Sequence, residues 1–272
     1  MELWEAIVLG LVQGLTEFLP VSSSGHLVLG EYLLGIDKEA AGNVTFEVFV
    51  HFGTVLSILT VYWRSVGDII GQSFGALVRP SEWRSRYVEI DGFRMGVNIL
   101  ITMIPTGITY ILFKDFLEAR FSDPRFVAGM LIVTGVLLLL TLLRKKPSGE
   151  VSPVKAFFIG VAQAFAMLPG ISRSGSTICT ALYLNTSPEK AANFSFLMLL
   201  PVVTIATAIK SIEMFQVGFS VSLMALLLGA LTAYVSGVVA IKLLLDIIRR
   251  GKIQYFAIYC FIVGGFGLWL LP

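Results

Sequence analysis

Long apolar runs alternate with short polar connections along most of this chain. Six of the runs are long enough to cross a bilayer, since about 20 apolar residues in a helix cover roughly 30 Å of hydrocarbon. The pattern predicts these helices near residues 44–63, 93–113, 126–143, 191–211, 219–245 and 253–271. It therefore indicates an all-α polytopic integral membrane protein, with 1–272 as a single membrane domain.

Two further apolar regions, 3–36 and 154–186, are each interrupted by a proline and then by a serine-rich turn. Five residues of the first region recur 150 positions later: Gly10 as Gly160, Gln13 as Gln163, Ser22 as Ser172, Ser24 as Ser174 and Gly25 as Gly175. Proline removes a backbone donor and disfavours helix in the residue before it. Each region therefore splits at Pro20 or Pro169. We interpret each as a re-entrant helix–loop–helix; a single kinked span is the alternative.

The basic residues predict the orientation, because cytoplasmic loops of membrane proteins carry an excess of lysine and arginine. They gather in the connections 64–91, 144–155 and 249–252, which places the two broken regions on opposite faces. The chain is then an inverted-topology repeat, 1–146 and 147–272, each half with one re-entrant region and three transmembrane helices. Duplicated broken helices of this kind point to a binding site. The connection 64–91 also mixes apolar residues with arginines and predicts an amphipathic interface segment.

The composition agrees with a membrane protein. Hydrophobic residues make up 56% and charged residues 14% of the chain, against about 25% charged in an ordinary soluble domain. No separate soluble domain is indicated. Cys179 and Cys260 lie in apolar surroundings without metal-ligand spacing and are expected to be buried thiols. Arg94 and Lys210 lie near span ends and are expected to extend toward the membrane surface.

The two serine-rich turns hold most of the residues that could carry chemistry. If the turns meet near the midplane, nine polar side chains converge: Ser22, Ser23, Ser24, His26, Ser172, Arg173, Ser174, Ser176 and Thr177. A serine just before a helix caps free N–H groups, and capping alone is the simpler interpretation. Helix starts also bind anions, and an arginine fork matches phosphate oxygens. An intramembrane arginine is costly, so a merely structural one needs a buried carboxylate partner.

One carboxylate lies close to the first turn in sequence. Gln13 and Glu17 are four residues apart and therefore share one helix face. Glu17 lies in an apolar run, where a lone carboxylate is costly unless it is paired, protonated or metal-bound. It could neutralise Arg173, act as a general base or bind a metal, and one residue could fill two of these roles.

Two histidines complete the set of candidates. His26 follows Ser23 by three residues and shares its helix face, where it could shuttle a proton or only make hydrogen bonds. Glu47 and His51 form another pair four residues apart, inside a predicted span. They could line the same cavity or simply satisfy each other. This inventory suits phosphoryl transfer or hydrolysis, and an anion transporter would need much of the same set.

The segment Gln13–His26 resembles the first motif and following serines of the undecaprenyl-pyrophosphate phosphatase (bacitracin-resistance) family. The segment Pro169–Thr177, PGISRSGST, is similar to that family's second signature. The segments 46–48 and 193–196 also fit its pattern, and the resemblance covers the whole length. This chain has glutamine at position 13, where many members have glutamate.

The resemblance implies an undecaprenyl-diphosphate phosphatase of the bacterial cell (inner) membrane, with its site facing the extracytoplasmic side. Such an enzyme converts undecaprenyl pyrophosphate to undecaprenyl phosphate and inorganic phosphate, which recycles the lipid carrier of cell-wall synthesis and confers bacitracin resistance. Its partners would be the polyprenyl pyrophosphate and the lipid bilayer, with no nucleic acid; a homodimer is left open. A divalent cation, Mg²⁺ or Ca²⁺, is implied, with Glu17 as its protein ligand.

The resemblance and the residue chemistry together give a set of site residues. The catalytic residues would be Ser23, Glu17, His26 and Arg173. The substrate phosphates would be bound by Gln13, Ser22, Ser24, Ser172, Ser174 and Thr177. Ser23 would attack the terminal phosphorus, activated by Glu17 directly or through His26, unless water attacks directly. The alternative function is a transporter or flippase of a phosphate-bearing lipid.

Overall fold

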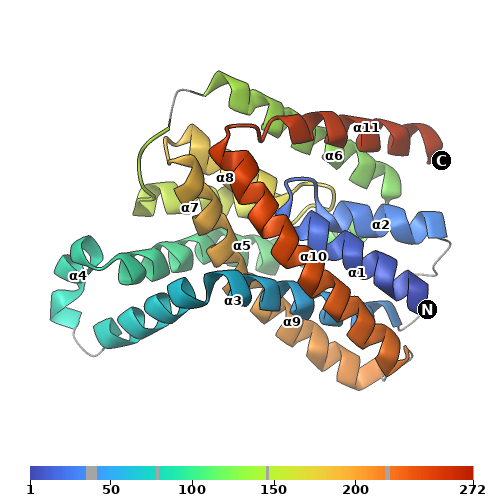
Figure 1. The fold of residues 1–272 in the computed structure, drawn as a ribbon, viewed down its shortest axis with the longest axis horizontal. Helices are drawn as coiled ribbons and strands as arrows, with labels where there is room; N and C mark the ends of the chain where they lie inside the picture. Colours follow the sequence, from blue (N-terminus) through green and yellow to red (C-terminus); the bar gives the residue numbers. More distant parts are fainter. Residues whose placement is uncertain (35–41, 78–79, 145–146, 218–220, 272) are drawn as a thin grey trace.

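The computed structural model describes residues 1–34, 42–77, 80–144, 147–217 and 221–271. Within these ranges all regular secondary structure is helical, apart from an isolated parallel bridge between Gly149 and Thr186. In chain order the helices are α1 (Leu3–Phe18), α2 (Ser23–Leu34), α3 (Gly42–Leu77), α4 (Trp83–Glu89), α5 (Asp91–Phe121), α6 (Pro124–Leu140), α7 (Pro153–Phe165), α8 (Arg173–Tyr183), α9 (Pro188–Val217), α10 (Leu223–Arg249) and α11 (Tyr255–Leu270), with short 3₁₀ turns η1 (Pro80–Glu82) and η2 (Thr141–Leu143) (Figure 1).

Within the described ranges, five helices are long and apolar enough to cross a membrane: Thr45–Ala76, Asp91–Phe121, Pro124–Leu143, Pro188–Ile212 and Leu223–Arg249. They correspond to five of the six predicted spans, so the chain is a multi-pass membrane protein. The sixth span, predicted over 253–271, is the helix α11. Its 16 residues extend about 24 Å at 1.5 Å per residue, so it is shorter than the predicted span.

Two of the predicted spans end where a longer helix is kinked. The span 44–63 ends beside Tyr62 in α3 (φ −112°, ψ 20°), and the span 93–113 ends at Phe113 in α5 (φ −126°, ψ 15°). Both helices continue beyond these non-helical residues. The predicted interface segment 64–91 therefore consists largely of the second half of α3 together with α4. It forms an arm that projects from the body of the molecule (Figure 1).

Local sequence explains where the shorter elements begin. The side chains of Asp123, Ser152 and Ser222 accept hydrogen bonds from backbone N–H groups at the starts of α6, α7 and α10. Such caps satisfy donors that have no partner inside the helix. Proline follows the first two caps, at the position where its missing N–H costs nothing.

Both broken regions fold as helical hairpins. The helices α1 and α2 pack together, and α2 turns back toward the N-terminal end of α1 (Figure 1). The second hairpin, α7 and α8, closes at its base: Gly149 N–H donates to Asn185 O (3.0 Å) and Ser187 N–H donates to Gly149 O (2.9 Å). Each broken region is thus a helix–loop–helix and not a single kinked span; that the two hairpins are re-entrant stays a prediction. Residues 35 and 36, which end the first predicted region, lie outside the described residues.

The first helix of each hairpin packs against a long helix from the other half of the chain. The helix α1 runs along α10, and α7 runs along α5. Equivalent glycines allow both approaches: a side chain at Gly10 would clash with Gly229 O, and one at Gly160 would clash with Thr102 O. Small residues at such interfaces let helix backbones come close. Each hairpin therefore packs, through its first helix, against a helix from the other half of the chain.

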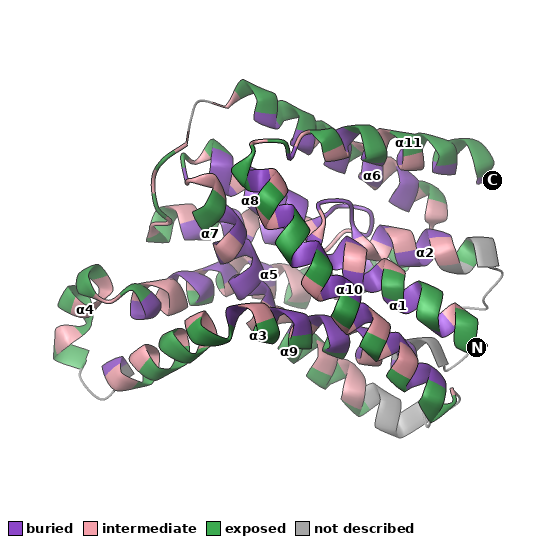
Figure 2. Cartoon of the chain, viewed as in Figure 1, coloured by how far each residue is buried: buried purple, intermediate pink, exposed green. Residues whose placement is uncertain are grey.

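The core lies where the hairpins meet the long helices. Phe18 of α1 and Phe196 of α9 are fully buried, with ring centroids 5.8 Å apart in an edge-to-face contact. The two cysteines, Cys179 and Cys260, are buried free thiols, as predicted. The outer faces of α6, α10 and α11 are exposed (Figure 2) and carry large apolar side chains such as Trp269. Surfaces this apolar suit contact with lipid rather than water.

Candidate active site

The turns of the two hairpins lie against each other, as the duplicated sequence predicts. A Cβ atom added to Gly25 would lie 3.3 Å from the Cα atom of Gly170. A Cβ atom added to Gly175 would lie 3.3 Å from the Cβ atom of Pro20. Positions 20 and 170, like 25 and 175, are equivalent in the two copies. Each turn therefore touches the other through the same two positions.

Two of the predicted phosphate ligands are helix caps. The Ser22 hydroxyl oxygen accepts from Gly25 N–H (3.2 Å), and the Ser172 hydroxyl oxygen accepts from Gly175 N–H (3.0 Å). Ser22 has a φ of 70°, in the left-handed region that is unfavourable for a serine. The capping role is thus observed for both serines. Their role as phosphate ligands stays a prediction.

The other hydroxyls of the turns differ in exposure. Ser174 and Thr177 are almost fully buried. Ser174 Oγ donates to Leu19 O (3.1 Å), and Thr177 Oγ1 lies 2.7 Å from the hydroxyl of Ser195. Ser24 is half-buried, with its hydroxyl 3.3 Å from that of the neighbouring cap. In the free protein the second turn is therefore locked by internal hydrogen bonds, while the first is more accessible.

Glu17 lies at the centre of the site. Its Oε1 atom accepts from the guanidinium of Arg173 (2.7 Å). Its Oε2 atom accepts from the Ser23 hydroxyl (2.6 Å) and from the side-chain amide of Gln13 (3.1 Å). Only 8% of the Glu17 side chain is exposed. The carboxylate therefore neutralises the arginine and, at the same time, hydrogen-bonds the hydroxyl that was predicted to be the nucleophile.

Arg173 is the first residue of α8, and its guanidinium is held from two sides. Nη2 donates to Glu17, and Nη1 donates to the main-chain oxygen of Ser195 in α9 (3.3 Å). The side chain is 15% exposed. A buried cation needs such partners. The position at a helix start also adds backbone N–H groups and the positive end of the helix dipole to the same place.

His26 points away from the predicted nucleophile. Its Nδ1 atom lies 2.8 Å from Ser22 O, and its Nε2 atom lies 2.8 Å from the hydroxyl of Tyr259, whose ring stacks on the imidazole. A carbonyl oxygen only accepts, so Nδ1 carries the proton and Nε2 accepts from the tyrosine. Both ring nitrogens are thus occupied by groups other than Ser23 and Glu17. Of the two predicted proton routes, the direct one matches this geometry.

Glu47 and His51 are not partners through their side chains. His51 Nδ1 bonds the main-chain oxygen of Glu47 (2.8 Å), while the Glu47 carboxylate pairs with Lys210. Lys210 is therefore paired within the protein instead of extending freely to the membrane surface. Arg94 pairs with the exposed carboxylate of Asp91 (2.6 Å), which is compatible with its predicted extension toward the surface.

Three residues that support the site were given no role by the sequence. Two are Ser195, whose main-chain oxygen accepts from Arg173, and Tyr259, whose hydroxyl donates to His26. Thr134 Oγ1 donates to Gly170 O (3.0 Å) and accepts from Ser172 N–H (2.9 Å), which fixes the second turn. Only Ser195 lay within a recognisable motif, the segment 193–196. The other two contact the site from α6 and α11, so no local pattern could reveal them.

The fold and the site define a class of multi-pass membrane proteins in which the turns of two helical hairpins enclose a cluster of polar and charged side chains. Residues 6–266 match the family described as bacitracin resistance protein BacA, and the chain belongs to this family.

Individual relatives agree with that family. The chain is 59% identical to an undecaprenyl-diphosphatase of Salinibacter ruber over 271 residues, covering 100% of both chains. It is 44% identical to one of Bacteroides fragilis over 269 residues, covering 97% of this chain and 96% of the relative. It is 41% identical to one of Halothermothrix orenii over 268 residues, with the same coverage. The predicted family resemblance is confirmed.

Proposed function

We propose that this membrane enzyme hydrolyses undecaprenyl pyrophosphate to undecaprenyl phosphate and inorganic phosphate, which recycles the lipid carrier for cell-wall synthesis and gives resistance to bacitracin. The observation that carries the proposal is the continuous contact from hydroxyl to carboxylate to guanidinium, Ser23–Glu17–Arg173. The relatives are named for this activity. The transporter alternative is not favoured, since binding an anion does not require a carboxylate that hydrogen-bonds a serine.

Ser23 is the nucleophile in this proposal. Its oxygen attacks the terminal phosphorus, and its proton passes to Glu17 Oε2, 2.6 Å away. The bond from that phosphorus to the bridging oxygen breaks, and undecaprenyl phosphate leaves with the electron pair. Glu17 then loses the proton to solvent and accepts another from the water that attacks the phosphoserine. Inorganic phosphate is released, and the serine regains its hydroxyl proton. Direct attack by water is the rival route.

Arg173 exchanges partners during binding. In the free protein its charge is balanced by Glu17. A pyrophosphate brings stronger, bidentate acceptors for the guanidinium fork. Nη2 then turns from Glu17 to the phosphate oxygens, while the bond from Nη1 to Ser195 O keeps the arginine in place. The freed carboxylate becomes a better proton acceptor. The arginine and the start of α8 stabilise the charge of the transferring phosphoryl group.

A divalent cation, Mg²⁺ or Ca²⁺, belongs to the proposal. The available donors are oxygens, which such cations prefer: the Glu17 carboxylate and Gln13 Oε1, a buried atom without a hydrogen-bond partner among the described residues. Over the same residues no group of three or more His, Cys, Asp or Glu could hold a metal ion. Water and substrate oxygens would therefore complete the coordination. A bound cation would neutralise phosphate charge.

The proposal places the enzyme in the bacterial inner membrane with the site open to the extracytoplasmic side. It treats 1–146 and 147–272 as inverted repeats whose hairpins enter from opposite faces. The packing of α1 on α10 and of α7 on α5 supports this arrangement. A homodimer is not required, because Glu17, Ser23 and Arg173 come from one chain.

The test is phosphate release from undecaprenyl pyrophosphate by the purified protein in detergent, with and without divalent cation. Loss of release in Ser23→Ala, with a phosphoserine captured at position 23 in acid-quenched wild-type protein, supports the serine route. Activity retained in Ser23→Ala, with no phosphoserine in the wild type, replaces it with direct attack by water. No release by folded wild-type protein in the presence of cation would overturn the enzyme proposal in favour of transport, measured as lipid translocation in vesicles.

A further inference from the structure

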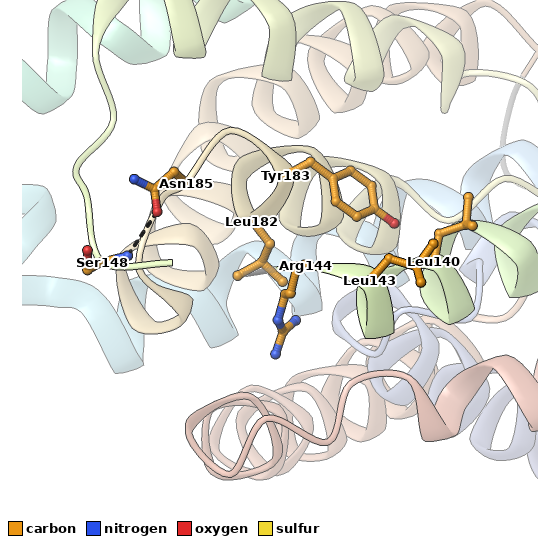
Figure 3. Close-up of a pocket in the computed structure, with 7 residues that line it drawn as sticks. All are labelled: Leu140, Leu143, Arg144, Ser148, Leu182, Tyr183 and Asn185. Carbon is orange, nitrogen blue, oxygen red and sulfur yellow. Dashed lines mark hydrogen bonds between the residues drawn. The ribbon is translucent and has the colours of Figure 1, made fainter. Parts of the chain in front are cut away.

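A second polar environment lies at the far end of α8. This helix begins at Arg173 in the candidate active site and ends at Tyr183, and its 11 residues extend about 16 Å. Beyond that end is a cavity of about 670 Å³ between the end of α8, the turn η2 and residues 148 and 185 (Figure 3). None of its lining residues belongs to the candidate active site. The cavity therefore needs its own explanation.

One wall of the cavity is apolar and continues into the lipid-facing surface. Leu140, Leu143 and Leu182 line it. Leu143 is 81% exposed, and Leu140 belongs to the same exposed flank of α6 as Val136 and Leu139. A hydrocarbon chain can lie along this flank without leaving the bilayer. Water-soluble ligands gain nothing from such a wall.

Two other lining residues, Ser148 and Asn185, offer hydrogen-bond donors. Ser148 contributes a hydroxyl, and Asn185 uses its Oδ1 atom to accept from Ser148 N–H (3.3 Å), which leaves its NH₂ group as a donor (Figure 3). The Tyr183 hydroxyl donates its proton to Leu137 O (2.6 Å), so it offers no donor to the cavity. The donors of Ser148 and Asn185 suit an anion rather than a cation.

Arg144 supplies the charge. Its Nη1 atom is buried and has no hydrogen-bond partner among the described residues. Its Nη2 atom would lie 3.7 Å from a Cβ atom at Gly251, whose neighbours in the chain are Arg250 and Lys252. A buried donor without a partner is costly, and a cationic one more so. Arg144 could instead neutralise the carbonyl end of α8, but Nη1 makes no hydrogen bond there.

We propose that this cavity binds the phosphate headgroup of a membrane lipid, with the phosphate on Arg144 and a hydrocarbon chain along Leu140 and Leu143. A free phosphate ion would share the headgroup chemistry but would leave the apolar wall unused. By the distribution of basic residues, the lipid belongs to the cytoplasmic leaflet. The site is separate from the proposed hydrolysis, so binding is measured without turnover.

The experiment uses the full-length protein in nanodiscs of phosphatidylcholine with a graded fraction of phosphatidylglycerol. Native mass spectrometry counts the phosphatidylglycerol molecules that stay bound after release. Arg144→Gln should weaken retention about tenfold, the size expected for one charge-assisted contact. Arg84→Gln removes the same charge from an exposed residue of another basic connection, 64–91, and should leave retention unchanged.

A second variant, Asn185→Asp, tests the proposal even if Arg144→Gln does not fold. Asn185 has a φ of 59°, which aspartate also tolerates. Asn185→Asp keeps the acceptor for Ser148 but adds a negative charge beside the phosphate, and it should also weaken retention. Equal retention in Asn185→Asp and the wild type overturns the proposal, and so does an equal loss in Arg144→Gln and Arg84→Gln. Displacement of the lipid by excess inorganic phosphate, dependent on Arg144, would assign the site to the free ion instead.

Discussion

The turns of the two hairpins share their helix caps and their contact positions but differ in their functional side chains. Both use a serine cap, at positions 22 and 172, and both touch the other turn through a glycine, at positions 25 and 175. The positions that carry the candidate chemistry differ at the same spacing of 150 residues. The first turn has Glu17, Ser23 and His26; the second has Met167, Arg173 and Ser176 at the equivalent places.

The residues that the two turns share have a structural role, and the residues that differ are the candidates for catalysis. The shared residues satisfy backbone N–H groups and allow the turns to approach, which any pair of such hairpins needs. The residues that differ place a hydroxyl and a carboxylate on one side and a cation on the other. A symmetric pair of turns would put two carboxylates or two arginines together, which would repel. Variants of one turn, each compared with a variant of the other, test this division.

The largest effect is expected from Arg173→Ala. It removes the cation that faces the phosphoryl group, and turnover should fall by about a thousandfold. Arg173→Lys should recover part of the rate, because lysine restores charge without the fork. Phosphate release from the purified variants measures both. Turnover near that of the wild type in the alanine variant would remove Arg173 from the mechanism.

Glu17→Gln tests the carboxylate against its counterpart in the second turn. The amide keeps the size and can still accept from Ser23, but it is a poor proton acceptor, so turnover should fall by about a hundredfold. Met167→Leu changes the equivalent position and should leave turnover within about twofold, since conservative apolar replacements cost little. Comparable losses in both variants would contradict the division between the turns.

Tyr259→Phe tests the positioning of His26. The variant loses the hydrogen bond to Nε2 but keeps the stacked ring. His26 takes no proton in the proposed mechanism, but its Nδ1–H holds Ser22 O, next to the nucleophile in the chain. A neutral hydrogen bond contributes about 1 kcal/mol, so loosening this support should lower turnover by severalfold. Ser176→Ala, at the position equivalent to His26, should have no such effect on turnover. Steady-state rates of both variants provide the measurement; a loss confined to Tyr259→Phe is expected.

The two caps should respond to glycine with opposite signs. Ser22 has a φ of 70°, whereas Ser172 has a φ of −69°. Glycine relieves the left-handed strain of about 1–2 kcal/mol at position 22 and loses only a few tenths as a cap. Ser22→Gly should therefore raise the midpoint of thermal unfolding in detergent. Ser172→Gly should lower it, and shifts of the same sign would refute the argument.

The smallest effect concerns Glu150 at the base of the second hairpin. Lys190, with Arg94, lowers the pKa of its carboxyl group. A lowered pKa means stability that is present above the unfolded value of about 4.3 and lost as the pH falls through the folded value. Because the pair is exposed, Glu150→Gln should cost at most about 0.5 kcal/mol at pH 7. Melting curves at pH 7 and in acid, at low salt, should show the difference from the wild type closing in acid.

The sequence predicted the helices better than it predicted the hydrogen bonds of the site. Apolar runs located the spans, and the kinks at Tyr62 and Phe113 show why two predicted ends fell inside longer helices. The pairing of Glu17 with Arg173 was foreseen, because a buried arginine needs a carboxylate. The orientation of His26 toward Tyr259 was not, since hydrogen bonds between distant helices leave no local pattern.

The packing of α1 on α10 has a consequence for biosynthesis. The close-packed glycine face of α1 is covered by α10, which begins only at Leu223. During translation this face has no native neighbour from α10 until most of the chain has been made. When the N-terminal half has been synthesised, this face of α1 is therefore still uncovered, and the membrane or a chaperone must hold it until the last fifth of the chain is made.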